Sequence, residues 1–314
     1  MIPLPVEAAH RLAAVAAEHR WLVEGLWAEE AVGIVGGEPK CCKSFLALDL
    51  AVSVASATPC LRRFPVPRSG RVLLYAAEDA LHVVRRRLEG ICCAAGVELK
   101  DIDIQVITSP TLRLDLESDR ARLAQTVAAL RPKLLVLDPF VRLHRIDENA
   151  SGEVAPLLAY LSELQRRHRL AVAVVHHSKK GAARARAGQA LRGSSEFHAW
   201  GDSNLYLRRQ GDDLTLTVEH RAAASIAPIA LQLLESGDAL ALAVDQRGKS
   251  IDPPTASVEE KIIRALAASA APLPLAALRA SCQVRTATLC AALATLAKQT
   301  RVEKAAAGYR LAKP

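Results

Sequence analysis

The sequence predicts an α/β fold in which helices cover both faces of a parallel sheet, followed by a small helical domain. Short, continuously apolar segments alternate four times with amphipathic helical segments, which is typical of such a sheet. Polar and acidic residues follow several of the apolar segments, where open α/β sheets bind their ligands. From residue 258 onward the chain changes to short helices, which indicates a separate domain.

The bulk composition sets the domain organisation. A chain of 314 residues with 51% hydrophobic residues can form one large domain and one small one. Aromatic residues make up only 4%, so the core is expected to consist of Ala, Leu and Val. We expect an N-terminal docking segment over 1–30, a core domain over 31–246, a linker over 247–257 and a small domain over 258–314.

Charge and cysteine usage narrow the functional classes. The net charge of +8 is compatible with nucleic-acid binding. The charged N-terminus does not resemble a signal peptide, and no uncharged apolar run is long enough for a membrane span, so we expect a cytoplasmic protein without a membrane partner. The seven cysteines include no CxxC spacing, which favours reduced thiols over a zinc site or disulfides.

The first thirty residues are expected to dock onto the core. Residues 7–20 have the pattern of a short helix, and 21–30 are apolar. Trp21 and Trp27 can either stack on an adenine or pack in the core, and core packing is the more common role of tryptophan.

Residues 31–44, AVGIVGGEPKCCKS, predict a phosphate-binding loop. A strand over 31–36 leads into a glycine pair, and Lys43 and Ser44 open a helix over 43–57. Backbone N–H groups at the start of such a helix bind phosphate oxygens, the Lys neutralises β/γ charge, and the Ser hydroxyl binds Mg²⁺. The motif has Gly before the Lys, whereas this chain has Cys42. The predicted nucleotide-binding residues are Gly37, Glu38, Pro39, Lys40, Cys41, Cys42, Lys43, Ser44 and Phe45.

The remaining elements of the sheet domain follow in regular order. The pattern predicts strands over 71–80, 102–107, 133–139 and 170–178, with helices over 81–96, 118–130 and 151–168. We expect Ser118 and Ser151 to cap their helices and Gly96 to end the first one. Residues 202–220 predict a hairpin with a Gly-Asp turn, and 227–245 predict further β structure.

Two acids at strand ends have the positions that phosphoryl chemistry needs. Asp138 follows the apolar run LLVL and is predicted to bind Mg²⁺ as a Walker B carboxylate. Glu78 follows the strand RVLLYAA and is predicted to orient and deprotonate an attacking water, with Asp79 as the competing choice.

Two further polar stretches follow the last parallel strand. His176 and His177 can sense a terminal phosphate, although a His at a strand end can equally be a simple hydrogen-bonding residue. Residues 178–195 then carry five positive charges and no acid: Lys179, Lys180, Arg184, Arg186 and Arg192. Such a basic loop favours binding to single-stranded nucleic acid over a solvated surface loop.

Taken together, several motifs resemble the RepA-type plasmid replicative helicases, which belong to the RecA/DnaB-like hexameric ATPases. These are GGEPKCCKS, LLYAAEDA, KLLVLDPFVRLHRIDENASGEV, VVHHSKKGA and LRGSSEFHAWGD, within about residues 31–235. The resemblance implies a RecA-like domain, a homo-oligomeric ring and ATP bound with Mg²⁺ between subunits. It matches Lys43 and Glu78 to catalysis, Asp138 to the metal and His177 to the strand-end His. It also places Arg221 near the finger that reaches a neighbour's nucleotide, with His220 and Arg208 as competing residues.

The C-terminal stretch predicts a winged helix–turn–helix. Helices are expected over 258–269, 274–280 and 286–298, followed by two short strands in VEKAAAGYRL. A winged helix of this kind can bind DNA through its third helix. Because that helix carries few charges, the domain can instead dock a protein.

The sequence therefore favours an ATP-dependent DNA motor, either a helicase or a DNA-remodelling ATPase of a mobile element. The alternative is a nucleotide-switched DNA-binding regulator that hydrolyses ATP weakly or not at all. A metabolite kinase is a third hypothesis, but nothing in the sequence resembles an acceptor pocket.

Overall fold

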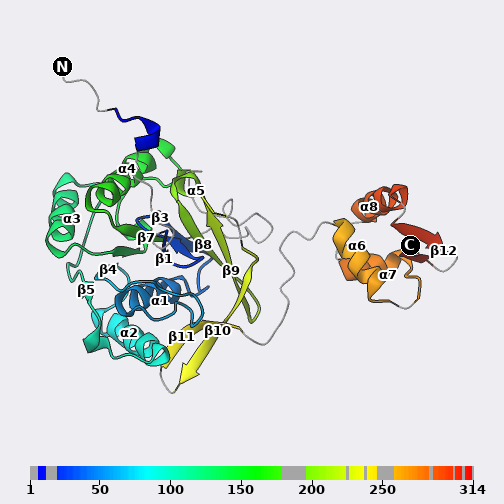
Figure 1. Cartoon of the computed structure of the whole chain (residues 1–314), viewed down its shortest axis with the longest axis horizontal. Helices are drawn as coiled ribbons and strands as arrows, with labels where there is room; N and C mark the ends of the chain where they lie inside the picture. The colour runs from blue at the N-terminus through cyan, green and yellow to red at the C-terminus, as the bar shows by residue number, and fades with distance from the viewer. Residues whose placement is uncertain are drawn as a thin grey trace. The chain divides into compact units, whose positions relative to one another are not determined.

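The computed structural model describes residues 6–11, 20–177, 196–223, 226–236, 239–245, 258–269, 271–282, 286–299, 301–305 and 308–312. These residues belong to two compact units, Met1–Lys249 and Ser250–Pro314, which are described separately below (Figure 1).

A single nine-stranded sheet forms the centre of the first unit, in the order β11-β10-β9-β8-β3-β7-β6-β4-β5. The strands from β8 to β5 are parallel to their neighbours, whereas β9, β10 and β11 continue the sheet antiparallel. The predicted parallel sheet and hairpin are therefore confirmed, and the two parts share one sheet. The strand bounds are β3 (Val32–Gly37), β4 (Val72–Ala76), β5 (Ile104–Val106), β6 (Leu134–Asp138), β7 (Ala171–His177), β8 (Ser203–Gln210), β9 (Asp213–His220), β10 (Ile229–Ser236) and β11 (Ala239–Val244).

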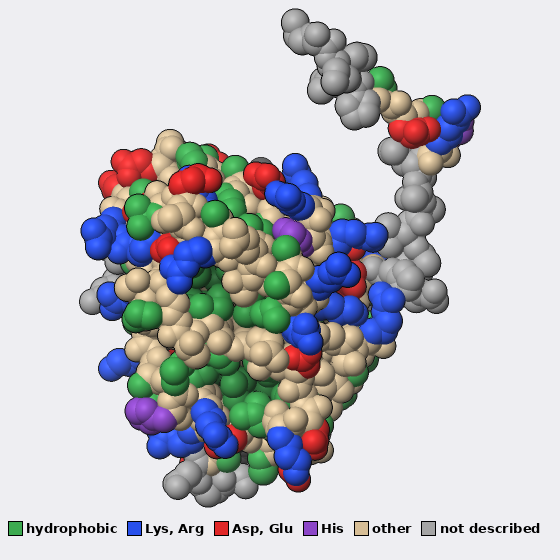
Figure 2. Space-filling view, turned by 90° about the vertical axis from the view of Figure 1, so that its left-hand side faces the viewer, with side chains coloured by type: hydrophobic (Ala, Val, Ile, Leu, Met, Phe, Trp, Pro, Cys, Tyr) green, Lys and Arg blue, Asp and Glu red, His purple; other side chains and the backbone are tan. Residues whose placement is uncertain are grey.

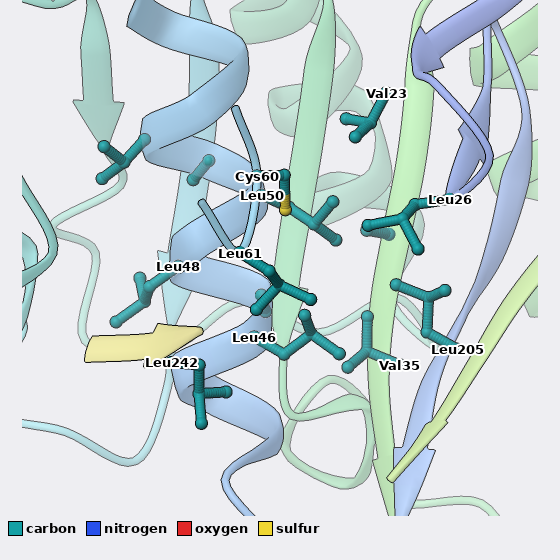
Figure 3. Packing of buried hydrophobic residues seen from close by; sticks show 14 of the residues in the cluster. Val23, Leu26, Val35, Leu46, Leu48, Leu50, Cys60, Leu61, Leu205 and Leu242 are labelled. Atoms are coloured by element: carbon teal, nitrogen blue, oxygen red, sulfur yellow. The ribbon is translucent and has the colours of Figure 1, made fainter. Parts of the chain in front are cut away.

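Helices cover both faces of this sheet, as Figure 1 shows. On one face α1 (Lys43–Ser56) and α2 (Leu81–Ala95) pack on the strands, and α3 (Glu117–Leu130), α4 (Ser151–His168) and α5 (Glu196–Trp200) cover the other. Two single 3₁₀ turns, η3 (Leu99–Asp101) and η4 (Phe140–Arg142), lie in the connections. Successive strand residues point to opposite faces, so Val35 joins the α1 core while Ile34 joins the α4 core. Figure 3 shows Leu46 of α1 beside Val35 and Leu205.

The helix predicted over 7–20 lies mostly outside the described residues. Residues 9–11 form one 3₁₀ turn, η1 (Ala9–Arg11), and 12–19 lie outside the described residues. Residues 21–28 form a small hairpin of β1 (Trp21–Val23) and β2 (Trp27–Ala28). Trp27 is fully buried, and its indole N–H donates to the Ala31 carbonyl at 3.2 Å, which confirms core packing for this residue.

Two predicted helix caps are wrong. Helix α3 begins at Glu117 after Leu116, and α4 begins at Ser151 after Ala150, so Ser118 and Ser151 lie inside their helices. Carboxylates in the first turns bind the preceding loops instead: Asp119 accepts from the Arg113 amide at 2.8 Å, and Glu153 accepts from the Asp147 amide at 3.0 Å. The Gly96 cap of α2 is confirmed, with φ near +72°.

A buried carboxylate attaches the Pro-rich connection over 58–70 to α1. Asp49 is fully buried and accepts hydrogen bonds from the Arg62 guanidinium at 2.6 Å and the Leu61 amide at 2.7 Å. The Cys60 thiol lies 3.3 Å from the same carboxylate. Because a buried carboxylate needs such partners, this contact holds the connection in place.

The second unit has three helices and a two-stranded sheet. The helices α6 (Val258–Ala267), α7 (Leu275–Cys282) and α8 (Thr286–Lys298) precede β12 (Val302–Ala305) and β13 (Gly308–Leu311). Its core includes Ile262, Leu266, Leu278, Leu289, Leu293 and Leu296. A bridge between Leu273 and Tyr309 links the segment before α7 to β13.

All seven cysteines are free thiols. Among the described residues, no helix has both the length and the apolar character that a membrane crossing requires.

Candidate nucleotide-binding site

The nine predicted phosphate-loop residues lie together in the turn between β3 and the first turn of α1. Gly37 ends β3 with φ near +152°, and a Cβ atom there would collide with the Leu207 carbonyl oxygen. Lys40 and Cys42 have φ near +64° and +65°, in the left-handed region that favours glycine. Cys42 therefore has a backbone conformation that glycine adopts most easily.

Lys43 is buried at the start of α1. Its ammonium donates to the Glu38 carbonyl at 2.7 Å and lies 3.9 Å from the Cys41 thiol. Burial lowers the pKa of Lys43, and the nearby Cys41 and Asp138 oppose this effect. A buried ammonium in a loop of backbone amides is a suitable partner for phosphate oxygens.

Asp138 lies beside Ser44, and its charge acts on the neighbouring Lys43. Burial raises the pKa of Asp138 to about 6; the hydrogen bond from Ser44 opposes this, while Asp79 and Glu78 add to it. The amide of Ala77, just after β4, donates to the Asp138 carbonyl at 2.7 Å. The strand ends of β4 and β6 thus bring the three acids to one edge.

The Ser44 hydroxyl and the Asp138 carboxylate fit Mg²⁺, which prefers oxygen ligands and retains several waters. In the part of the chain that the structure describes, no group of three or more His, Cys, Asp or Glu residues could hold a metal ion. A Mg²⁺ site with only two protein ligands, completed by phosphate oxygens and water, does not need a group of three such side chains. The absence of such a group among the described residues is therefore compatible with Mg²⁺ at Ser44 and Asp138.

Each of the two candidate general bases has an arginine partner. Glu78 accepts from the Arg142 guanidinium at 2.8 Å, whereas Asp79 forms an ion pair with Arg87 of α2. Arg87 also lies 5.3 Å above the ring of Phe45 in α1. The sequence did not single out Arg142 or Arg87, because arginines are common on exposed helix faces.

The two strand-end histidines point to opposite faces of the sheet. In register, His177 lies beside Gly37 and His176 beside Gly36. His176 is buried on the α4 side, stacked on Phe197 at 4.2 Å and 3.8 Å from Glu148. The expectation that both face the phosphates is therefore wrong for His176, because strand residues alternate between faces. His177 follows Val175 on the α1 face.

Arg221 lies at the other end of the sheet from the phosphate loop. It follows β9, whose His220 is paired with Ser203 at the start of β8, while Gly37 is paired with Leu207 near the end of β8. Its guanidinium donates to the Ala199 carbonyl at 2.5 Å and pairs with Asp202 at 2.8 Å. It can reach a nucleotide only if that nucleotide belongs to a neighbouring subunit.

Unlike Arg221, Arg209 reaches the phosphate loop of its own chain. Arg209, near the end of β8, donates to the Cys42 sulfur at 3.2 Å. The competing candidates behave differently: His220 bonds to Ser203 and Gly25, and Arg208 is half-buried in β8. Sequence reasoning missed Arg209, since only the β3–β8 pairing brings it to the loop.

The predicted DNA-binding residues Lys179, Lys180, Arg184, Arg186 and Arg192 lie outside the described residues.

On the face that lies to the left in Figure 1, Lys and Arg side chains are spread around a centre of hydrophobic ones (Figure 2). A cavity of about 550 Å³ lies along α2 and residues 96–100, lined by residues such as Arg85, Cys93 and Lys100. It shares no residue with the phosphate loop, and the chemistry of the loop locates the site better than cavity size does.

Residues 3–183 match the family described as the AAA domain, which covers more than half of the chain. The chain belongs to that family. Within this AAA domain lie β3, the phosphate loop, both candidate bases and Asp138. Among solved structures, a DnaB-like replicative helicase, described with its interactions with primase, resembles this protein with a TM-score of 0.51 and 14% sequence identity.

That likeness covers 65% of this chain and 55% of the helicase chain, so the AAA protein spans little more than half of the helicase's length. At such low identity the likeness concerns the fold. The predicted fold class is confirmed as an α/β fold in which helices cover both faces of a mostly parallel sheet.

Proposed function

We propose that this protein is an ATP-dependent DNA motor that hydrolyses ATP at the subunit interfaces of a homo-oligomeric ring. One observation carries the proposal: Lys43 and Ser44 of α1, Asp138 of β6 and Glu78 just after β4 meet at one edge of the sheet. Both the AAA domain match and the fold likeness to a DnaB-like helicase support it.

The four residues have distinct roles in this proposal. Lys43 neutralises the β/γ phosphates of ATP, and loop amides bind their oxygens. Ser44 and Asp138 would hold Mg²⁺, which when bound would supply positive charge to the β and γ phosphates. Glu78 orients the attacking water and accepts its proton. To do so the Glu78 carboxylate leaves Arg142, its partner at 2.8 Å.

Contacts with DNA and with neighbouring subunits complete the proposal. Arg221 serves as the finger toward a neighbour's nucleotide, and His177 responds to the terminal phosphate. The basic residues over 179–192 contact single-stranded DNA; five phosphate contacts would give a salt slope of about −3.5 per subunit. The second unit acts as a winged helix that binds DNA or a protein partner. Hexameric assembly and RepA-type replication are the specific form we favour.

ATP turnover with and without single-stranded DNA tests the motor. We expect DNA to stimulate turnover and Lys43→Ala to abolish it. Lys100→Ala is the matched control, since Lys100 is exposed and pairs with Glu98 on the surface. Native mass measurement with an ATP analogue and an oligonucleotide reads the assembly state. A monomer under all these conditions would contradict the ring.

The alternative is a DNA-binding regulator that binds ATP as a switch and hydrolyses it weakly. The Arg142–Glu78 contact favours it, because this contact occupies the candidate base. Tight ATP binding with no turnover, with or without DNA, would support the regulator and exclude the motor.

A further inference from the structure

The two consecutive acids after β4 are paired with arginines in different settings. Asp79 forms an ion pair with Arg87 of α2, whose side chain is 27% exposed. The Arg87 guanidinium also lies 5.3 Å from the centre of the Phe45 ring. Glu78 instead accepts a hydrogen bond at 2.8 Å from Arg142, whose side chain is 62% exposed. Arg87 is therefore held by two neighbours and partly shielded from water, whereas the pair of Arg142 and Glu78 is open to solvent.

The contact with Arg142 draws Glu78 away from the phosphate loop. Arg142 belongs to η4, and its neighbours Phe140 and Leu143 are buried in the core on the α4 side of the sheet. Helix α1, which begins with Lys43, packs on the opposite face. A Glu78 carboxylate bound to Arg142 is therefore held toward the α4 side, and in that position it does not orient a water beside phosphates on the loop.

Only the side chain of Arg142 has to move to free Glu78. The backbone of η4 is fixed, because the Phe140 and Leu143 side chains are fully buried. In addition, the Leu114 amide donates to the Leu143 carbonyl at 2.6 Å. An ion pair between two exposed groups shifts an equilibrium by about two- to five-fold. The pair is thus weak enough to open in each catalytic cycle, yet strong enough to slow turnover.

We propose that Arg142 is a positioning residue that restrains ATP hydrolysis by holding Glu78 in an unproductive orientation. This inference rests on the proposed function, because it concerns the residue that orients the attacking water. Asp79 does not take that role, since Arg87 keeps its carboxylate paired. When Arg142 turns into solvent, the Glu78 carboxylate is free to accept a hydrogen bond from the water.

Steady-state ATP turnover of the full chain, measured without DNA over a range of ATP concentrations, tests this restraint. We expect Arg142→Gln to raise kcat about two- to five-fold and to leave KM for ATP unchanged, because it removes only the exposed ion pair. Arg142→Lys, which keeps the charge, should raise kcat less. Arg85→Gln is the matched control: Arg85 forms an exposed ion pair with Glu89 on α2, and its loss should leave kcat unchanged.

Salt and the two acids separate a restraint on Glu78 from a general structural effect. Because salt screens exposed ion pairs, the ratio of kcat in Arg142→Gln to kcat in wild type should fall toward one between about 0.05 M and about 0.5 M salt. The gain should persist when Asp79→Asn is added to Arg142→Gln. Adding Glu78→Gln should remove it.

An unchanged or lower kcat in Arg142→Gln would overturn the restraint and leave ATP hydrolysis itself in place. A gain that survives Glu78→Gln, or a kcat ratio that does not change with salt, would overturn it as well. Turnover that appears only in Arg142→Gln would support both the restraint and the proposed function. No turnover in wild type and in every variant would overturn the proposed function, and the restraint with it.

Discussion

Replacing Asp138 by Asn should stabilise the nucleotide-free protein at neutral pH. Burial raises the pKa of this carboxyl to about 6, compared with an ordinary value of 3.8. A difference of roughly two pKa units corresponds to about 3 kcal/mol of stability lost when the group is ionised in the folded protein. Asparagine has nearly the same shape, can still accept the Ser44 hydrogen bond and carries no charge.

The sign of the pH dependence follows from the same shift. The folded protein binds the Asp138 proton more tightly than the unfolded chain does. Folding therefore takes up a proton between about pH 6 and pH 4, and wild-type stability rises relative to Asp138→Asn as the pH falls through that range. The gain from the substitution should be largest at pH 7.5 and nearly gone at pH 4.

Urea denaturation followed by tryptophan fluorescence measures this difference. Trp21, Trp27 and Trp200 all lie in the first unit, so the signal reports the domain that contains Asp138. Asp103→Asn is the control of opposite sign, because hydrogen bonds from Gln105 and Arg71 lower the pKa of Asp103. An Asp138→Asn variant that is less stable than wild type at pH 7.5, or a gain that persists at pH 4, would refute the reasoning.

Two further predictions follow from close contacts. Gly37→Ala should lower the free energy of unfolding by about 3 kcal/mol and abolish ATP binding, because the new Cβ meets the Leu207 carbonyl. Gly211→Ala, which has open space around it, should lower it by about 1 kcal/mol. Equal losses for the two variants in urea denaturation would argue against a steric cause. Asp49→Ala should lower the free energy of unfolding by about 3 kcal/mol in the same assay, because it leaves the largely buried Arg62 without its ion-pair partner. Glu89→Ala on the exposed face of α2 should have no measurable effect. An Asp49→Ala variant as stable as wild type would mean that the connection over 58–70 stays in place without the ion pair.

The sequence could predict the elements whose pattern is dictated by burial. Strands β3, β4, β6 and β7 are buried on both faces and therefore appear as uninterrupted apolar runs. The strand, turn and helix around the predicted phosphate loop could also be predicted, because Lys43 and Ser44 follow Gly37 at the spacing of a known motif. Asp138 could be placed because it directly ends such a run.

Other features depend on contacts between distant segments, which local patterns do not encode. The Arg209–Cys42 contact joins residues 167 positions apart and exists only because β8 pairs with β3. The partners of Glu78 and Asp79 likewise depend on where η4 and α2 lie. The caps failed for a different reason: Ser118 and Ser151 match a cap pattern, but carboxylates one and two residues later bind the loops.

The position of β3 in the sheet predicts that its amides exchange with deuterium more slowly than those of the phosphate loop. Strand β3 is hydrogen-bonded to β7 on one side and to β8 on the other, so its amides are held in two ladders. These amides should exchange with deuterium only when the whole domain unfolds, while the Glu38–Cys42 amides should exchange much faster without nucleotide. Fast exchange in β3 would contradict this. The pairing of β3 on both sides therefore predicts that, under the proposed function, ATP binds and leaves while β3 stays paired in the sheet.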